Sequence, residues 1–416
     1  MKKKTGQKAA SRPRASRVSQ AAQVAEPVAD GPFTAEERAT IAFFSVEGIG
    51  PKTLKKIRDA FGSLAQALRE PGEKIAPYLN NDQVRQAFLT AGDHAALADR
   101  VLARSDELGI RVLFPGRPGW PRQFEESAGF PPLLYVKGEF DPDALRVAIV
   151  GSRDTDLYGE QLSGFFASAL SDRGISIVSG GARGIDRAAH AESMNEAGGT
   201  IAVLGCGVDV VYPRENELLF QQLERKGALV SHFPPGTPAV AQNFLVRNRV
   251  IAALADVTLV VRADADSGSL STAMAAIELR RPVFAIPGDV THPLAAGSNG
   301  LLENALARAC TGLAPIAGAL GIEGEDWPTL AMPGRERKEY KVRSNAPPPR
   351  LAPPQRRAEV PEELRPIWEA LGKRPVQFDE LVESTGLEAA TLANALVRLE
   401  LLGLCEERAG KVFART

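Results

Sequence analysis

Two segments, Val147-Ala-Ile-Val-Gly-Ser-Arg153 and Ile175-Ser-Ile-Val-Ser-Gly-Gly-Ala-Arg-Gly-Ile-Asp186, decide the fold of this chain. In each, a short β-branched run ends in Gly and Ser, an Arg follows, and a helix-compatible stretch begins. Such turns place backbone N–H groups and a helix N-terminus around an anion, and Arg adds donors suited to phosphate. Gly and Ser would also serve as plain tight turns of a doubly wound fold, but the repeated arrangement favours an anion site.

Apolar runs alternate with helical patterns from residue 145 to residue 312. This alternation predicts an α/β fold whose core is a Rossmann-like, doubly wound parallel sheet. We expect strands at 146–150, 175–179, 200–204, 228–231, 257–262 and 282–286, preceded by strands at 111–114 and 133–138. Polar, glycine-rich segments follow the strand ends, where such sheets bind ligands.

Four arginines near these strand ends, Arg153, Arg183, Arg247 and Arg249, are the candidates for phosphate contacts. Several Arg side chains on one rim suit a groove that follows a nucleic-acid backbone better than a small-molecule pocket. The full predicted contact set is Gly151, Ser152, Arg153, Ser179, Gly180, Gly181, Arg183, Gly184, Arg247, Asn248, Arg249, Ser267, Gly268 and Ser269.

Several of these residues also have a purely structural alternative. Arg247 or Arg249 could pair with an acid such as Asp256 to hold a helix. Asn248 could bond a base edge or cap a loop, and residues 267–269 could hold a phosphate or only start a helix. We expect Asp186 to orient the loop that carries Arg183, and His190, four residues further on, to pack in the core.

Composition bounds the remaining possibilities. The length of 416 residues predicts two or three domains, and the net charge of −1 indicates no particular partner. Residues 1–32 begin with a run of basic residues and lack the apolar segment of a signal peptide, so we expect a disordered basic arm. No stretch is apolar enough to span a membrane. Cys206, Cys310 and Cys405 are odd in number and far apart, which favours a reducing cytoplasm over a disulfide framework.

The segments that flank the predicted sheet (109–315) have patterns of their own. Residues 33–108 are helical and contain a Gly-apolar-Gly-Pro turn, in which Gly48, Gly50 and Lys52 resemble a helix-hairpin-helix (SAM-like) phosphate site or a merely structural hairpin. Residues 316–360 are Pro-rich and basic, which predicts a linker. Residues 361–416 predict a winged helix, with helices near 364–371, 379–384 and 388–402 and a wing around Ala409-Gly410.

Cofactor and metal motifs are missing from the sequence. The four His show no metal-ligand spacing with Cys or carboxylates, so we predict no metal. No P-loop occurs, and the glycines at 180, 181 and 184 do not have dinucleotide-binding spacing. We therefore predict no cofactor.

Taken in order, the motifs GSR, SGxARGID, AH, YPxEN, FxxRNR, SGSLxTA, PG and GSN between residues 110 and 312 resemble the DNA-processing protein A family, called DprA or Smf. The resemblance implies a cytoplasmic, homodimeric protein that binds single-stranded DNA and loads the RecA recombinase, particularly in natural transformation. The helix-hairpin-helix-like and winged-helix-like segments match the layout of that family.

This chain departs from the family pattern at several positions. Gly181 replaces a usual Leu, Leu245 replaces a Pro, and Ala305-Leu306 replaces Gly-Ala after GSN. His232 and Arg262 stand where the family usually has Glu, and we expect these two changes to raise the positive potential near the strand ends.

The resulting prediction is a non-enzymatic mediator that protects single-stranded DNA and loads RecA. The alternative is a Rossmann-like nucleoside-monophosphate phosphoribohydrolase, which has a similar sheet and a PGGxGTxxE turn. The corresponding stretch here is Gly268–Thr272, and Ala275 occupies the position of the Glu that this chemistry needs. In the winged helix, the third helix is net negative and has one amide, Asn394, so we expect it to bind protein and not to read DNA.

Overall fold

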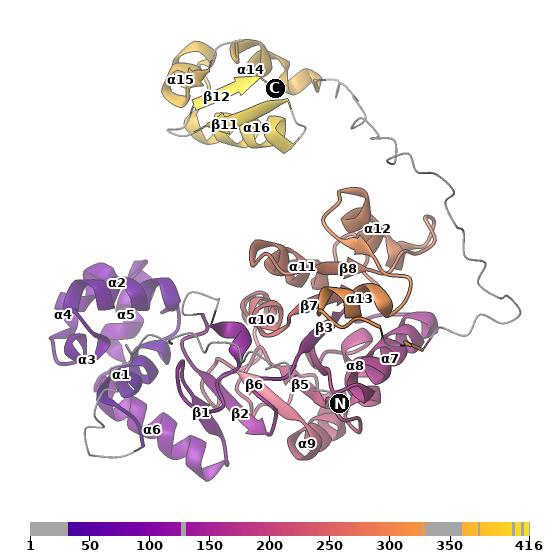
Figure 1. The fold of residues 1–416 in the computed structure, drawn as a ribbon. Coiled ribbons are helices and arrows are strands. Elements are labelled where there is room, and N and C mark those ends of the chain that lie inside the picture. Colours follow the sequence, from indigo (N-terminus) through magenta and orange to yellow (C-terminus); the bar gives the residue numbers. More distant parts are fainter. Residues whose placement is uncertain are drawn as a thin grey trace, which may run out of the picture. The chain divides into compact units, whose positions relative to one another are not determined.

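The computed structural model describes residues 32–125, 130–324, 326–328, 360–372, 375–401, 404–408 and 412–415. The chain divides into two compact units, Met1–Met332 and Pro333–Thr416 (Figure 1). The predicted basic arm (apart from Pro32) and most of the predicted linker lie outside the described residues.

A nine-stranded sheet forms the centre of the first unit, in the order β1-β2-β6-β5-β4-β3-β7-β8-β9. β1 pairs antiparallel with β2, and β2 pairs antiparallel with β6. The remaining strands, β6, β5, β4, β3, β7, β8 and β9 in sheet order, run parallel to one another. The predicted Rossmann-like α/β class is therefore confirmed. The strands are Arg111–Leu113, Leu134–Gly138, Arg146–Val150, Ser176–Ser179, Thr200–Val203, Ala228–Ser231, Val257–Val260, Val283–Ala285 and Arg308–Ala309 for β1 to β9.

The strand order reverses between β3 and β7, which makes this point the topological switch of the sheet. Open α/β sheets bind ligands outside the carboxyl ends of the strands at such a point. All eight strands expected from the sequence are present, with ends shifted by up to two residues. The sequence does not predict β9, because two residues carry no periodic signal.

Helices cover both faces of the sheet. One face carries α10 (Ala241–Leu254), α11 (Ser269–Glu278) and α12 (Ala296–Glu303). The other carries α7 (Leu157–Asp172), α8 (Ile185–Ser193), α9 (Glu217–Lys226) and α13 (Ala314–Ala319). Short 3-10 turns occur at 76–78, 122–124, 214–216, 293–295 and 362–364.

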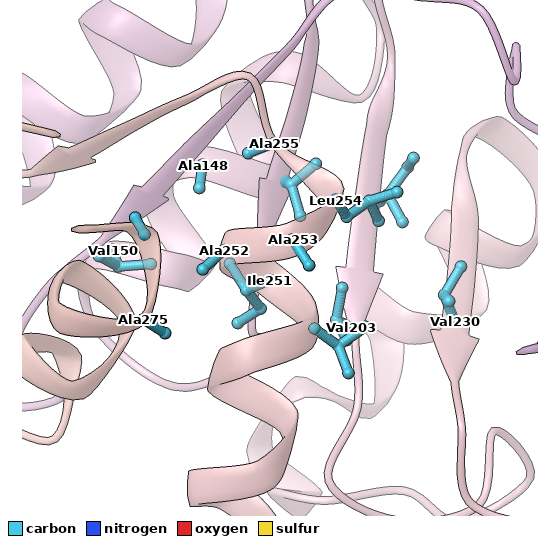
Figure 2. Close-up of a cluster of buried hydrophobic side chains, with 14 of the residues drawn as sticks. Ala148, Val150, Val203, Val230, Ile251, Ala252, Ala253, Leu254, Ala255 and Ala275 are labelled. Atoms are coloured by element: carbon cyan, nitrogen blue, oxygen red, sulfur yellow. The ribbon is translucent and has the colours of Figure 1, made fainter. Parts of the chain in front are cut away.

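Helix α10 lies close against the sheet because the residues at its carboxyl end are small. Figure 2 shows Ala252, Ala253 and Ala255 of this region packed with Ala148 of β3 and Val203 of β5 in one buried cluster. Small side chains allow a close helix–sheet approach without a cavity. The packing fixes the amino-terminal half of α10 at the switch point.

The amino-terminal helices pack on the sheet and share its core. They are α1 (Ala35–Phe44), α2 (Pro51–Phe61), α3 (Leu64–Ala67), α4 (Gly72–Ile75), α5 (Asp82–Thr90) and α6 (His94–Glu107). Thr34 and Glu37 form the capping box that opens α1. Ile41 of α1 and Ala98 of α6 belong to the same buried cluster as Leu133 and Tyr135 of the β2 segment.

The linker predicted to begin at residue 316 begins later. Helix α13 spans Ala314–Ala319, and its Ile316 and Ala317 are buried against the sheet. Trp327 packs against the same cluster, with the Arg173 guanidinium carbon 5.2 Å from its ring centroid. The sequence of this helix contains Pro315 and Gly318, which are typical of loops, so its apolar contacts were not predicted.

The second unit has the predicted winged-helix elements. They are α14 (Arg365–Ala370), α15 (Phe378–Thr385), α16 (Ala389–Leu401) and a sheet of order β10-β12-β11. β11 (Cys405–Arg408) and β12 (Val412–Arg415) pair antiparallel as the expected wing, whereas the sequence does not predict the two-residue β10 (Val376–Gln377). The turn predicted at Ala409-Gly410 lies outside the described residues.

Ala305 ends α12 in a conformation that suits glycine. Its φ is +54°, its N–H bonds the carbonyl of Leu302 at 3.1 Å, and the N–H of Leu306 bonds that of Leu301 at 2.9 Å. This pair of bonds is a Schellman motif with Ala at the position that usually holds Gly. A side chain in this region costs about 1–2 kcal/mol.

We therefore expect Ala305→Gly to raise the free energy of unfolding by about 0.5–1 kcal/mol, since relief of strain exceeds the added entropy of the unfolded chain. Denaturant titration of the full chain measures this change. Ala265→Gly, at an exposed position where φ is not positive, is the matched control and should destabilise. A loss of stability in both variants would contradict the strain argument.

Candidate nucleic-acid interface

A cleft of about 510 Å³ opens at the switch point of the sheet. Its walls are the turn after β3, the first half of α10 and the segment that leads into α11. An adjoining hollow of about 480 Å³ shares Arg153, Ala182, Tyr212, Phe244 and Arg247 with it. Together the two are lined by these predicted residues: Gly151, Ser152, Arg153, Gly180, Arg183, Arg247, Asn248, Ser267, Gly268 and Ser269.

Arg247 crosses the floor of this site and is only 4% exposed. Its Nη1 donates to the carbonyls of Val203, at 2.7 Å, and Gly180, and its Nε donates to Asn248 Oδ1 at 3.0 Å. Arg247 therefore has a structural role beside the predicted phosphate contact, which stays a prediction. Most of its donors are committed to the protein, and the side chain joins the ends of two strands to α10.

A buried carboxylate faces this arginine. Asp186 accepts hydrogen bonds from the N–H groups of Gly180, at 3.1 Å, and Ala182, at 3.3 Å. A Cβ at Gly180 would lie 2.7 Å from both Asp186 Oδ2 and Arg247 Nη1, so only glycine fits there. Burial raises the pKa of Asp186 despite the opposing charge of Arg247, and burial lowers the pKa of Arg247 to about 10, which leaves it charged at neutral pH.

His190 does not pair with Asp186. Its Nδ1 lies 2.7 Å from the Thr200 hydroxyl, and burial lowers its pKa to about 3, so the ring is neutral. The expected structural roles of Asp186 and His190, the first orienting the loop of Arg183 and the second packed in the core, are confirmed.

The side chains of Arg153 and Arg183 lie exposed at the solvent surface of the site. The Arg153 guanidinium carbon lies 5.3 Å from the ring centroid of Phe244. The Arg183 side chain is 51% exposed, and its nearest acid, Asp154, is 3.8 Å away and 91% exposed. An exposed pair at this distance compensates little charge. These two arginines are available to an anion.

Two further predicted residues of α10, Arg249 and Asn248, also contact side chains of the protein. Arg249 pairs with Glu278 of α11 at 3.1 Å, and not with Asp256, whose carboxylate pairs with Arg122 at 2.9 Å. Asn248 donates to Ser271 Oγ at 2.7 Å and to the Gly268 carbonyl at 3.1 Å. Its oxygen accepts from Arg247, and these bonds fit the alternative in which Asn248 fixes the loop before α11.

The two defining turns interlock. The N–H of Ile185, at the start of α8, bonds the Ser152 carbonyl at 3.3 Å, and a Cβ at Gly184 would lie 2.4 Å from that oxygen. Ser179 Oγ donates to the carbonyl of Ile149 at 2.6 Å. Gly184 and Ser179 therefore hold the two turns together, and this part of the α8 N-terminus is occupied by protein. Gly181, with φ of +67°, takes a left-handed conformation in the same loop.

Sequence reasoning missed an aromatic pair in the site. The ring centroids of Tyr212 and Phe244 are 5.3 Å apart, and Tyr212 is 43% exposed. Both residues stand in motifs noted in the sequence, YPREN and FLVRNR, but periodicity gives no sign that the two meet. Exposed aromatic rings beside arginines are the usual components of single-stranded nucleic-acid sites.

Neither of the two departures places an uncompensated positive charge near the strand ends, so the predicted rise in positive potential rests on the loss of the two Glu side chains. Arg262 is 8% exposed and pairs with Asp156, the cap of α7, at 2.9 Å. His232 is 1% exposed among Phe44, Phe130 and Phe233, and burial lowers its pKa to about 3. Asp156 compensates the charge of Arg262, and His232 is uncharged at neutral pH.

Within the residues that the structure describes, no group of His, Cys, Asp or Glu is arranged to hold a metal ion. No helix in that part of the chain combines the length and the apolar surface of a membrane span.

The sheet, its switch-point cleft and the winged-helix unit define a Rossmann-like protein with a cationic, partly aromatic ligand site. The family model described as DNA recombination-mediator protein A matches residues 111–321, and the DprA winged helix domain matches residues 347–411. The chain belongs to the DNA recombination-mediator protein A family.

Similar proteins extend over most of the chain. Protein Smf of Synechocystis is 30% identical over 393 residues, which cover 91% of this chain and 99% of that protein. A putative DNA processing protein DprA of Mycobacterium tuberculosis is 36% identical over 81% of this chain and 87% of its own length. The X-ray structure of DNA processing protein A from Streptococcus pneumoniae aligns with a TM-score of 0.55 and 29% identity, over 67% of this chain and 95% of that chain.

The position of Arg247 predicts that its removal destabilises the fold. Arg247→Ala would leave two buried carbonyls without donors and Asp186 without a compensating charge, so we expect a loss on the order of 3–5 kcal/mol in the free energy of unfolding. Arg183→Ala, at an exposed side chain, should change stability by less than about 0.5 kcal/mol. Denaturant titration compares the two variants, and equal stabilities would contradict the structural role of Arg247.

Proposed function

We propose that this chain binds single-stranded DNA as a recombination mediator, protects incoming DNA and loads the RecA recombinase in natural transformation and homologous recombination. Membership of the DNA recombination-mediator family supports this proposal. The observation that carries it is the site itself, in which the exposed Arg153 and Arg183 flank the Tyr212–Phe244 pair.

The chemistry of this site fits a single strand better than a duplex. Arginines bind phosphates, and an exposed ring stacks on bases that a duplex would keep inside its own stack. The buried Arg247, whose charge Asp186 compensates, supports these groups from below by joining two strand ends to α10. The interlocked turns and Asn248 hold these groups in place before DNA arrives.

The same site favours binding over catalysis. Ala275 is 8% exposed in α11, so the position at which a phosphoribohydrolase would need its Glu holds a methyl group in the core. Asp186, the buried carboxylate at the site, already accepts two backbone N–H groups. We propose that the protein breaks no bond, acts in the cytoplasm and works as a homodimer.

For the arginines, we expect Arg183→Ala to weaken binding of a single strand by on the order of 1–3 kcal/mol, through loss of a charge-assisted contact. The slope of log affinity against log salt should flatten by about 0.7. Arg183→Lys should restore only part of the affinity, because an ammonium cannot reproduce the bidentate fork. Fluorescence anisotropy with single strands, duplexes and mononucleotides measures these changes.

Arg225→Ala, which removes an exposed arginine on α9 away from the cleft, is the control and should bind as the parent does. Arg183→Ala with parental affinity would refute the site. Release of free base from a nucleoside monophosphate, abolished by the same change, would establish the hydrolase instead.

The winged helix is expected to serve a protein partner. The exposed side chains of α16 include Thr391, Asn394, Val397, Arg398 and Glu400, with one cation and one amide among them, and Val397 is 54% exposed. A helix that reads DNA needs several cationic or amide side chains on its exposed face. Deletion of residues 360–416 should therefore leave single-strand affinity within about threefold of the parent, and a tenfold loss would assign DNA contacts to this domain.

A further inference from the structure

The turn between α1 and α2 lies beside the mouth of the cleft. Gln242 Nε2, in the first turn of α10, lies 3.5 Å from Glu47 Oε1 in this turn. Ala241, the neighbour of Gln242, lines the cleft. At the end of α1, the Phe44 ring centroid is 6.0 Å from that of His232, which follows β6. A chain molecule leaving the cleft over the start of α10 therefore meets this turn next.

Helix α2 begins at this turn and exposes two uncompensated lysines. Lys55 pairs with Asp59 at 2.6 Å, and Arg58 pairs with Glu36 at 3.1 Å. Lys52 and Lys56 are exposed and have no acid within 4.0 Å among the described residues. Positions four apart lie on one face of a helix, so their two charges stand one above the other.

The start of α2 differs in charge from the starts of α1 and α5. α1 has Glu36 and Glu37 in its first turn and α5 has Asp82, and each is capped by a side chain. α2 has no acid in its first turn and no side-chain cap, and Lys52 stands there. Because the helix dipole favours acids at this end, Lys52 reduces the stability of its own helix and concentrates positive potential.

One glycine of the hairpin also has a packing role. Gly48 has φ of +84°, and a Cβ there would lie 2.4 Å from Val84 Cγ2 of α5. Gly48 is therefore needed for packing inside the amino-terminal domain. Gly50 precedes α2 and has open space around its Cα. The side chains that remain for a ligand are the lysines.

We propose that a single strand held in the cleft continues past Gln242 and Glu47 onto α2, where Lys52 and Lys56 bind its phosphates. This inference rests on the proposed function of the cleft. The five residue-to-residue steps from Glu47 to Lys52 span at most about 18 Å, so a few nucleotides bridge the gap. We take the same DNA strand as the occupant of α2, because this helix follows on from the cleft and its lysines are opposite in charge to phosphate. Glu47 lies on the path with a like charge to the phosphates, so its removal strengthens binding.

The test compares strand lengths. Oligothymidines of about 6 and about 25 nucleotides are titrated by fluorescence anisotropy into the full-length parent and the double variant Lys52→Gln/Lys56→Gln. For the long strand we expect affinity to fall about five- to tenfold at low salt and the salt slope to flatten by about 1.4, two phosphates at 0.7 each. The short strand, which fits within the cleft, keeps parental affinity. Glu47→Gln raises affinity for the long strand only.

Two matched variants complete the experiment. Lys74→Gln/Lys226→Gln makes the same change in net charge at exposed lysines away from α2 and leaves both affinities unchanged. Lys52→Arg/Lys56→Arg keeps both charges and retains long-strand affinity. If the Lys52→Gln/Lys56→Gln variant binds the long strand with parental affinity, the proposed path is wrong and the cleft assignment stands. The same conclusion follows if this variant loses affinity equally for both lengths. An Arg183→Ala variant with parental affinity for both lengths removes the cleft assignment itself.

Discussion

The buried guanidinium of Arg247 is the interaction on which the rest of the site depends. It joins the carbonyls at the ends of β4 and β5 to Asn248, which in turn holds the loop before α11. Asp186 completes this arrangement from the opposite side by binding the N–H groups of the second turn. The buried Arg247 and Asp186 side chains thus order three loops under the cleft, and their opposite charges compensate each other.

The small residues of the two turns follow from this arrangement. Gly180 leaves room for Arg247 and Asp186, and Gly184 allows α8 to contact the carbonyl of Ser152. At these positions glycine permits contact between protein segments, and the exposed arginines at the rim are left for the ligand. The chemical character of the site comes from a few side chains on a tightly interlocked frame.

Much of the fold could be predicted from the alternation of apolar runs with helical patterns, because the buried strands are short apolar runs and several of them end in glycine or serine. The position of the cleft followed from the rule for parallel sheets. The roles of single residues did not follow. The structural role of Arg247 did not follow, because its acceptors are two backbone carbonyls and the side chain of its neighbour, which no sequence pattern records. Arg249 pairs with Glu278, 29 positions away, and Tyr212 meets Phe244 across 32 positions, so both contacts depend on tertiary packing.

The amino-terminal helices and the central sheet share one buried cluster, which α1, α6 and the β2 segment form together. Leu133 and Tyr135 are fully buried, and the helices that cover them belong to residues 33–108. A shorter chain that lacked these helices would expose apolar side chains at one edge of its central sheet. The amino-terminal domain is therefore not a detachable module. A descendant that lost this domain would need polar side chains on the uncovered face of the sheet. Otherwise another segment or another subunit would have to cover that face.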